Sequence, residues 1–485
     1  MISSVNIPSF NAIQPDSNGI TASAAHKEVE FSYNPQDGFV MSPTTTTLKD
    51  VTIDKHGPST SRVDLRGENL APNKDGNFVF DPKDAKKFTA AASLATVAKT
   101  VETFEKAMGS KIDWAFGGEK IELYPDAGVD LNAYYSRDER SLNFFHADVK
   151  GTKYMTGASG EVVSHEVGHA MLDGIRPDYL VSWKADTNGF HEAFADTTAM
   201  LMATQDDGVC ELVAQQTGGD MSKPNCLAYV AEELGKACNE EYGRNVTGGD
   251  FLRNAQNDFK WQAPHTVPKN PSGTDPLTTE MHSWSRIWTG AQYDLLSAMV
   301  ESKMSAGMSQ ADAIKSSGQE CMELYAKTLK LSPQSNCTYR QMAQCMLKAD
   351  AQLGGKNHQF IVDSFTNRNI LFEGDDQPDM MAMAMPENPV PRKVTVTLGD
   401  ECGMFAGAEV SGVVERDPNI MYATDAGDEL SSDIKTLIDQ GSILYTEPGQ
   451  HLSLADKFDK NGNPYVGIVT WTDGKMVIER NTMIS

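Results

Sequence analysis

Apolar residues at helical spacing mark one long helix near residue 80. Asp81-Pro82 supplies a cap and a first helical position, and Gly109 supplies a stop. Between them the apolar residues recur three or four positions apart: Leu94, Val97, Val101, Phe104 and Met108. Because residues at this spacing share one face of a helix, the stretch predicts a helix that packs into the core.

Four short runs with strand character follow this helix, at residues 111–116, 119–124, 131–135 and 141–147. They are expected to form a mixed sheet whose edge lines a cleft. From residue 164 to 353 the pattern becomes mostly helical, with an apolar stripe formed by Trp284, Ile287, Trp288, Ala291 and Leu295. The chain is therefore expected to be α+β, with a lobe containing the edge strand over residues 61–163 and a helical lobe over 164–373.

Both ends of the chain differ in composition from its middle. Residues 1–60 are rich in Ser, Thr, Asn and Pro and are expected to form a weakly ordered prefix. Residues 374–391 combine Asp375-Asp376 with repeated Met-Ala and several prolines, which indicates a linker more than a soft-metal site. A small β domain is expected over residues 392–485, from β-type runs at 393–398, 409–414, 442–445, 466–472 and 476–480.

The chemistry concentrates in the stretch His165-Glu166-Val167-Gly168-His169. Residues four apart on a helix lie on the same face, so His165 and His169 can offer two imidazole nitrogens to one metal ion. The surrounding residues favour a helix that Gly174 and Pro177 bring to an end. A catalytic zinc ion needs one more protein ligand and leaves a fourth position for water.

Glu192 is the candidate third ligand. It lies in a second expected helix, residues 190–204, and Asp196 follows it by four positions on the same face. Asp196 is expected to hold a ligating imidazole by hydrogen bonding to its other nitrogen. The five-residue motif alone also occurs by chance in proteins that bind no metal, but the second helix makes the pattern a constellation that favours a zinc site.

This pattern resembles the thermolysin-like branch of the gluzincin metallopeptidases, in which HExxH precedes a helix carrying Glu and, four residues later, Asp. Three more segments are similar and occur in the family's order: residues 131–135, Arg253, and His282 with the serines and aromatic residues after it. The resemblance covers roughly residues 80–355. It implies a two-lobed catalytic unit with zinc between a mixed sheet lobe and a helical lobe.

The resemblance also implies roles for individual residues. Glu166 would act as the general base, and His282 would stabilise the oxyanion of the tetrahedral intermediate. Asn132 and the Ala133 backbone would hold the substrate as an added strand, and Arg253 would contact the substrate carbonyl beyond the scissile bond. The implied activity is zinc-dependent cleavage of internal peptide bonds in a protein or peptide substrate.

Some features depart from the family pattern. The stretch from His169 to Glu192 is longer than in thermolysin, and Tyr179, a candidate second oxyanion donor, is out of register. Asp275 or Glu280 could orient His282, although neither has the family's spacing. A helical residue next to Glu192 projects about 100° away, so His191 is interpreted as structural and not as a ligand.

The overall charge narrows the range of partners. The chain has 485 residues with 42 basic and 67 acidic side chains, a formal net charge of −25. Such a charge opposes binding to nucleic acid or an anionic membrane surface. Acidic clusters could bind Ca²⁺, but no full EF-hand loop is present, and residues 459–463 fit a hairpin turn better. Nothing in the sequence indicates an oligomeric state.

Targeting features are few. Residues 1–11 have neither a basic start nor an apolar core, and no long apolar run indicates a membrane span. We therefore expect synthesis in the cytoplasm, with leaderless export left open. The cysteine count is seven, so at least one cysteine has no partner within the chain, and the lack of a CxxC pair argues against a second, structural zinc.

Two alternatives to an endopeptidase stay open. A gluzincin exopeptidase would need an acidic anchor for a free amino terminus, and no glycine-rich anchor motif of that kind is found. A binding or assembly module could keep the metal and act through the C-terminal domain. Glu166 favours an enzyme, because a purely structural zinc site has no use for a base.

Overall fold

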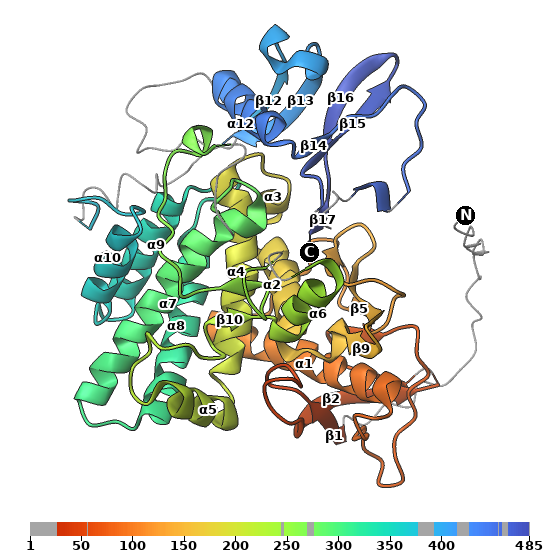
Figure 1. Ribbon diagram of the computed structural model, residues 1–485, viewed down its shortest axis with the longest axis vertical. Coiled ribbons are helices and arrows are strands. Elements are labelled where there is room, and N and C mark those ends of the chain that lie inside the picture. Colours follow the sequence, from red (N-terminus) through yellow and green to blue (C-terminus); the bar gives the residue numbers. More distant parts are fainter. Residues whose placement is uncertain are drawn as a thin grey trace.

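The computed structural model describes residues 27–55, 57–243, 247–268, 276–376, 392–414, 426–453, 455–457 and 464–484. These residues form a mixed α/β structure in which sheet and helices occupy different regions (Figure 1). Asp275, most of the expected linker and the expected hairpin at 459–463 lie outside the described residues.

The largest sheet has the strand order β1-β2-β3-β4-β5-β7-β6-β17. Two of its pairs, β4 with β5 and β5 with β7, are parallel, and the other pairs are antiparallel. Its strands are β1 (Lys27–Tyr33), β2 (Thr44–Asp54), β3 (Gly57–Ser59), β4 (Val63–Leu65), β5 (Ile121–Tyr124), β6 (Ala133–Ser136), β7 (Ser141–Phe144) and β17 (Met483–Ile484).

The expectation of a weakly ordered prefix over residues 1–60 is wrong from residue 27 onward. Strand β1 alternates polar with apolar residues, and the apolar residues Val29, Phe31 and Tyr33 are buried. This alternation of period two is the pattern of a half-buried strand, and it outweighs the polar composition. Residues 1–26 lie outside the described part of the chain.

Helix α1 (Ala85–Met108) covers the large sheet. It ends at Gly109, whose φ of +65° lies in the left-handed region that glycine tolerates, so the predicted end is confirmed. Helix α1 contacts β1, β2 and β4, and it also contacts α2 and α8. It therefore lies between the sheet and the helical region.

The strand expected at residues 111–116 is wrong. The Gly117 amide donates to the Trp114 carbonyl, and the Trp114 indole donates to the Glu119 carbonyl 3.2 Å away. These bonds close a turn before β5. The run at 141–147 divides into β7 and β8 (His146–Val149), which forms a separate hairpin with β9 (Thr152–Met155).

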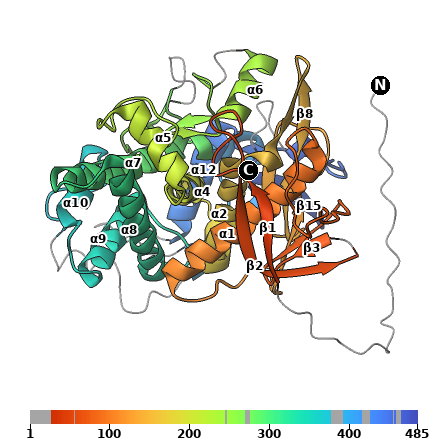
Figure 2. The ribbon, with the colours of Figure 1, turned by 90° about the horizontal axis from the view of Figure 1, so that it is seen from below.

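The helical region gathers on the opposite side of the molecule from β1 to β3 (Figure 2). Its core is aromatic, with Trp284, Trp288, Tyr325, Tyr339 and Phe190 fully buried. The elements here are a 3₁₀ turn (Thr156–Ala158), α2 (Gly160–Ile175), α3 (Pro177–Leu180), α4 (Ala185–Ala203), α5 (Asp207–Thr217), β10 (Tyr229–Val230), α6 (Glu232–Tyr242), β11 (Arg253–Asn254), a 3₁₀ turn (Pro264–Thr266), α7 (Met281–Ser305), α8 (Gln310–Leu331), α9 (Tyr339–Gln352) and α10 (His358–Asn367). None of the helices in the described ranges is both long and apolar enough to span a bilayer.

The C-terminal region is not purely β, which corrects the expectation of a small β domain. Its sheet has the order β12-β13-β16-β15-β14. Helix α12 (Ala426–Gln440) packs on β12 and β13 through Leu430, Ile434 and Leu437. The remaining elements are β12 (Arg392–Thr397), a 3₁₀ turn (Asp400–Phe405), β13 (Glu409–Val414), β14 (Ile443–Leu444), a 3₁₀ turn (Ala455–Lys457), β15 (Gly467–Thr472) and β16 (Lys475–Arg480). After β16 the chain returns to the large sheet as β17 (Figure 1).

Candidate metal centre

Helix α2 carries the HExxH motif, and its first turn is tied to the N-terminal part of the chain. The Ser159 hydroxyl accepts a hydrogen bond from the Val162 amide, 3.1 Å away, and itself donates to the Asp37 carboxylate. The Asn34 side chain donates to the Ala158 carbonyl at 2.7 Å. The loop after β1 therefore stabilises the start of the helix that carries the motif.

Helix α4 lies directly against α2. A Cβ atom at position 168 would approach the Cα of Ala195 to 2.8 Å, so only glycine permits this helix spacing. The close approach brings Glu192 of α4 to His165 and His169 of α2. The middle of the HExxH motif thus also determines how near the third ligand lies.

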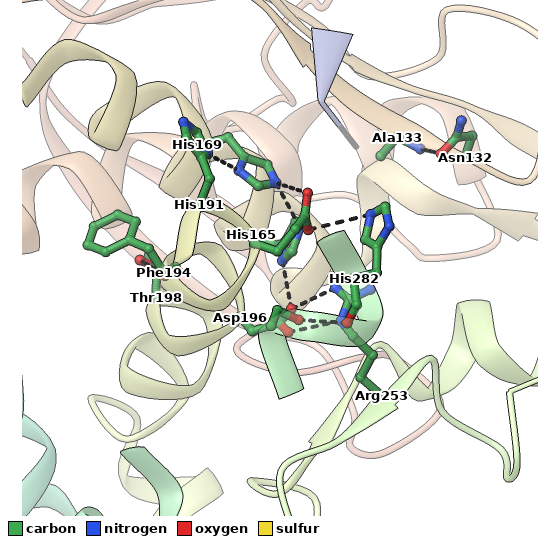
Figure 3. Close-up of polar contacts among 12 residues, drawn as sticks. Asn132, Ala133, His165, His169, His191, Phe194, Asp196, Thr198, Arg253 and His282 are labelled. Atoms are coloured by element: carbon green, nitrogen blue, oxygen red, sulfur yellow. Dashed lines mark hydrogen bonds and ion pairs between the residues drawn. The ribbon is translucent and has the colours of Figure 1, made fainter. Parts of the chain in front are cut away.

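The three predicted ligands converge, and Figure 3 shows the two histidines among them. The two Nε2 atoms of His165 and His169 are 3.0 Å apart. The Glu192 carboxylate oxygens lie 3.5 Å from His165 Nε2 and 3.7 Å from His169 Nε2. Two atoms each about 2.0–2.1 Å from a tetrahedral zinc ion lie about 3.3 Å apart. The observed separations bracket this value, so the three side chains fit a single zinc ion.

Burial strengthens the case for a cation. Glu192 is completely buried, and neither of its carboxylate oxygens accepts a hydrogen bond from the described residues. A buried carboxylate without donors is costly unless a positive charge compensates it. Glu192 therefore needs positive charge beside it, which a metal ion or protonated histidines facing it would supply.

Asp196 lies against His165, on the side away from Glu192. Its Oδ1 is 3.0 Å from His165 Nδ1, which leaves His165 Nε2 facing the other ligands. The Arg253 guanidinium binds the same carboxylate through Nε at 2.9 Å and Nη2 at 2.6 Å. Although burial raises the pKa of Asp196, Arg253 and His165 outweigh it and hold that pKa well below its usual range. Asp196 therefore stays ionised.

His191 is the partner of the second histidine, a role that the sequence interpretation missed. Its Nδ1 lies 2.9 Å from His169 Nδ1, and the two rings stack. If His169 offers Nε2 to a metal ion, its Nδ1 carries the proton and donates it to His191. His191 thus orients His169 as Asp196 orients His165.

We expect His191→Ala to weaken zinc binding by about 10- to 100-fold, because such supporting hydrogen bonds contribute about this much to metal affinity. His191→Asn keeps an acceptor and should retain most of the affinity. Competition with a chromophoric chelator measures both variants. Unchanged affinity in His191→Ala would show that the 2.9 Å contact does not orient the ligand.

Glu166 lies beside the three ligands. It is buried, and one carboxylate oxygen has no hydrogen-bond partner in the described structure. Burial raises the pKa of Glu166 to about 8, against the lowering effect of His165 and of a hydrogen bond from the Tyr135 backbone. The carboxylate thus lies between the ligand cluster and strand β6.

His282 lies in the first turn of helix α7 and reaches into the site from the other side (Figure 3). Its Nε2 lies 3.4 Å from Glu192 Oε2, and its Nδ1 lies 2.7 Å from Glu280 Oε1. Burial lowers the pKa of His282, but Glu192 and Glu280 outweigh it and raise that pKa to about 10. Glu280 is therefore the acidic partner that the sequence left unassigned between two candidates.

The remaining predicted residues differ in their placement. Ala133 begins β6, and the Asn132 side chain accepts a hydrogen bond from the Ala133 amide at 2.9 Å. Arg253 is brought to the site by its pairing with Asp196. Tyr179 is not: it is fully buried, and its hydroxyl donates to the Pro333 carbonyl at 2.8 Å. The suggestion that Tyr179 is a second oxyanion donor is wrong, because helix α3 turns this side chain into the core.

A second acidic cluster lies beside the start of α2. Oxygen atoms of Asp37, Glu161 and Glu232 lie within 4.8 Å of one another, and all three residues are buried. Burial raises the pKa of Glu232 to about 8, and it also raises the pKa of Glu161, with Glu232 adding to the effect. Three carboxylates at this distance share protons in the folded protein.

This cluster predicts that stability falls as pH rises. The pKa of Glu232 in the folded chain is about 8, above its ordinary value of 4.5. Between these two pH values the folded chain therefore binds a proton that the unfolded chain has lost, and the resulting stabilisation disappears as the pH approaches 8. We expect the free energy of unfolding in a chelator to decrease by on the order of 2 kcal/mol from about pH 5 to pH 8. Glu232→Gln should flatten the dependence, and Glu241→Gln, at an exposed position of α6, should not. Urea unfolding over this range tests the sign, and equal slopes in all three proteins would contradict it.

Comparison of the sequence with protein-family models and with curated proteins finds no match.

Proposed function

We propose that this chain is a zinc-dependent endopeptidase, and that His165, His169 and Glu192 hold its metal ion. The observation that carries the proposal is the convergence of these three ligands around Glu166, a buried carboxylate that is not needed as a ligand. Structural zinc sites are closed by four protein ligands, whereas catalytic sites have three and an open position. A base beside an open position supports hydrolysis.

A zinc ion held there would supply Lewis acidity, acidifying water and polarising a carbonyl group. The chain's own residues complete the chemistry. Beside the zinc ion the raised pKa of Glu166 would fall, and the ionised carboxylate would take a proton from the attacking water and pass it to the leaving nitrogen. His282 donates from Nε2 to the oxygen that becomes negative in the tetrahedral state, and Glu280 keeps that histidine oriented.

The edge of β6 supports an extended peptide as the substrate. Ala133 would pair with the peptide backbone, the Asn132 side chain would hold it, and Arg253 would contact the carbonyl beyond the scissile bond. Main-chain pairing recognises any extended segment, which suits an endopeptidase better than a small-molecule hydrolase. The resemblance to thermolysin-like peptidases extends the proposal to a two-lobed unit, with the large sheet in one lobe and α4 to α10 in the other.

Metal removal tests the proposal. We expect the purified chain to contain about one zinc ion and to cleave casein slowly. A catalytic site with three protein ligands holds one zinc ion, and that ion activates water for hydrolysis. Treatment with 1,10-phenanthroline should stop cleavage, and added zinc should restore it. Mass spectrometry of the products distinguishes internal cleavage from the stepwise loss of end residues that an exopeptidase gives. A zinc-loaded chain that cleaves nothing would instead favour a binding module.

A further inference from the structure

The edge of β6 is already occupied in this structure. Strand β17 pairs with β6 in the antiparallel direction, with Met483 opposite Ser136 and Ile484 opposite Tyr135. The other side of β6 is taken by β7, so β17 uses the remaining hydrogen-bonding edge. A strand has two such edges, and two segments cannot pair with one edge at the same register.

This edge adjoins the metal centre. The Tyr135 backbone, which pairs with Ile484, also hydrogen-bonds the Glu166 carboxylate. In Figure 3 the blue ribbon of a C-terminal strand is drawn near Ala133, and β17 pairs with β6 at Tyr135 and Ser136, shortly after Ala133. The segment therefore occupies the part of the β6 edge that directly follows the proposed substrate contacts at Asn132 and Ala133.

Side chains hold the segment before and within β17. The Thr482 hydroxyl donates to Asp138 at 2.7 Å, the Asn481 amide donates to the Tyr465 carbonyl at 2.9 Å, and Ile484 is 3% exposed. Arg480 donates to the Ser182 carbonyl at 3.0 Å and to Asn188 of α4 at 2.7 Å. The segment is therefore docked at defined positions and not a loose tail.

Strand β17 shows which peptide chemistry the edge accepts. Its backbone is extended, and the side chain opposite Tyr135 is a buried isoleucine. A competing peptide needs an extended backbone and an apolar side chain at that position, since such a residue replaces the buried area of Ile484.

We propose that β17 is an internal competitor, which occupies the substrate edge of β6 and restrains the activity until it is displaced. This inference rests on the proposed function, because it assigns β6 to substrate binding. Tethered segments act at effective concentrations of roughly millimolar, so a peptide with a dissociation constant of about 0.1 mM for the free edge would bind about tenfold more weakly while β17 is in place.

Peptide binding without turnover tests the inference. The probe is a fluorescein-labelled peptide of the β17 segment, Arg-Asn-Thr-Met-Ile, and the protein carries Glu166→Gln so that nothing is cleaved. Two variants displace β17: Ile484→Asp places a charge at a buried position, and Met483→Pro removes a backbone donor. Met404→Asp, at a residue 64% exposed in the same C-terminal region, is the matched control.

Fluorescence anisotropy should give a dissociation constant about tenfold lower in both displaced variants than in the parent and the control. Zinc content and thermal unfolding establish that each variant is folded. The inference would be overturned if all four proteins bound the peptide with the same dissociation constant, or if none of them bound it.

Turnover separates this inference from the proposed function. With Glu166 restored, displacement of β17 should raise kcat/KM for an extended peptide by about tenfold. If the wild type cleaves the peptide and neither variant cleaves it faster, the proposal that β17 is a competitor is wrong and the proposed peptidase function stands. If the displaced variants bind the peptide more tightly but no zinc-loaded protein cleaves it, the proposed peptidase function is wrong and the proposal that β17 occupies a peptide-binding edge stands.

Discussion

Glu166→Gln is expected to lower peptide hydrolysis by about 100- to 10,000-fold while leaving about one zinc ion bound, because the amide no longer accepts the water proton. Glutamine has nearly the same shape as glutamate, so the packing around this buried position should persist. The measurement is kcat on a quenched peptide, together with zinc content by mass spectrometry.

Glu211→Gln is the matched control for this experiment, because it makes the same change at an exposed position of α5, outside the ligand cluster. It should keep both zinc and activity. Full activity in a zinc-loaded Glu166→Gln protein would exclude Glu166 as the base. Loss of zinc in that variant would instead make it a ligand.

His282→Ala is expected to lower kcat by about 100- to 1,000-fold with little change in KM, the effect of removing one donor to a developing oxyanion. His282 reaches the site from α7 and is not among the three proposed ligands, so zinc content should stay the same. Steady-state kinetics on the zinc-loaded protein provide the measurement.

Two further variants delimit the role of His282. Glu280→Gln should give a smaller loss, because Nε2 remains and only its orientation through Nδ1 weakens. His146→Ala changes a histidine paired with Asp126 in another part of the fold and should have no effect on kcat. If His282→Ala raised KM and left kcat unchanged, His282 would be a substrate-binding group and not an oxyanion donor.

The sequence predicted the convergence of His165, His169 and Glu192, because each lies in a helix with local signals. Spacing by four places His165 and His169 on one face, and helix α2 ends at Ile175, before Pro177, as the sequence indicated. Helix α4 begins five residues earlier than expected, at Ala185, but Glu192 lies within it under either boundary. Local periodicity therefore suffices for the ligands.

The supporting residues were harder to predict, because their roles depend on packing between elements. His191 points away from Glu192 on its own helix, and only the approach of α2 to α4 brings it to His169. Strand β17 has two residues, too few to show any period, and its partner β6 is far away in the sequence. Helix α12 did have a local signal in Leu430, Ile434 and Leu437, but the neighbouring strand runs obscured it.

The contacts between Asp37, Ser159 and Asn34 at the start of α2 have a thermodynamic consequence. Asp37 is 122 residues upstream of the serine that caps the helix of the two histidines. If the cluster holds a metal ion as proposed, and if that ion binds better when this early segment is docked, then metal binding must stabilise the docking by the same free energy. Zinc uptake during synthesis would then report that the first and central parts of the chain have already come together.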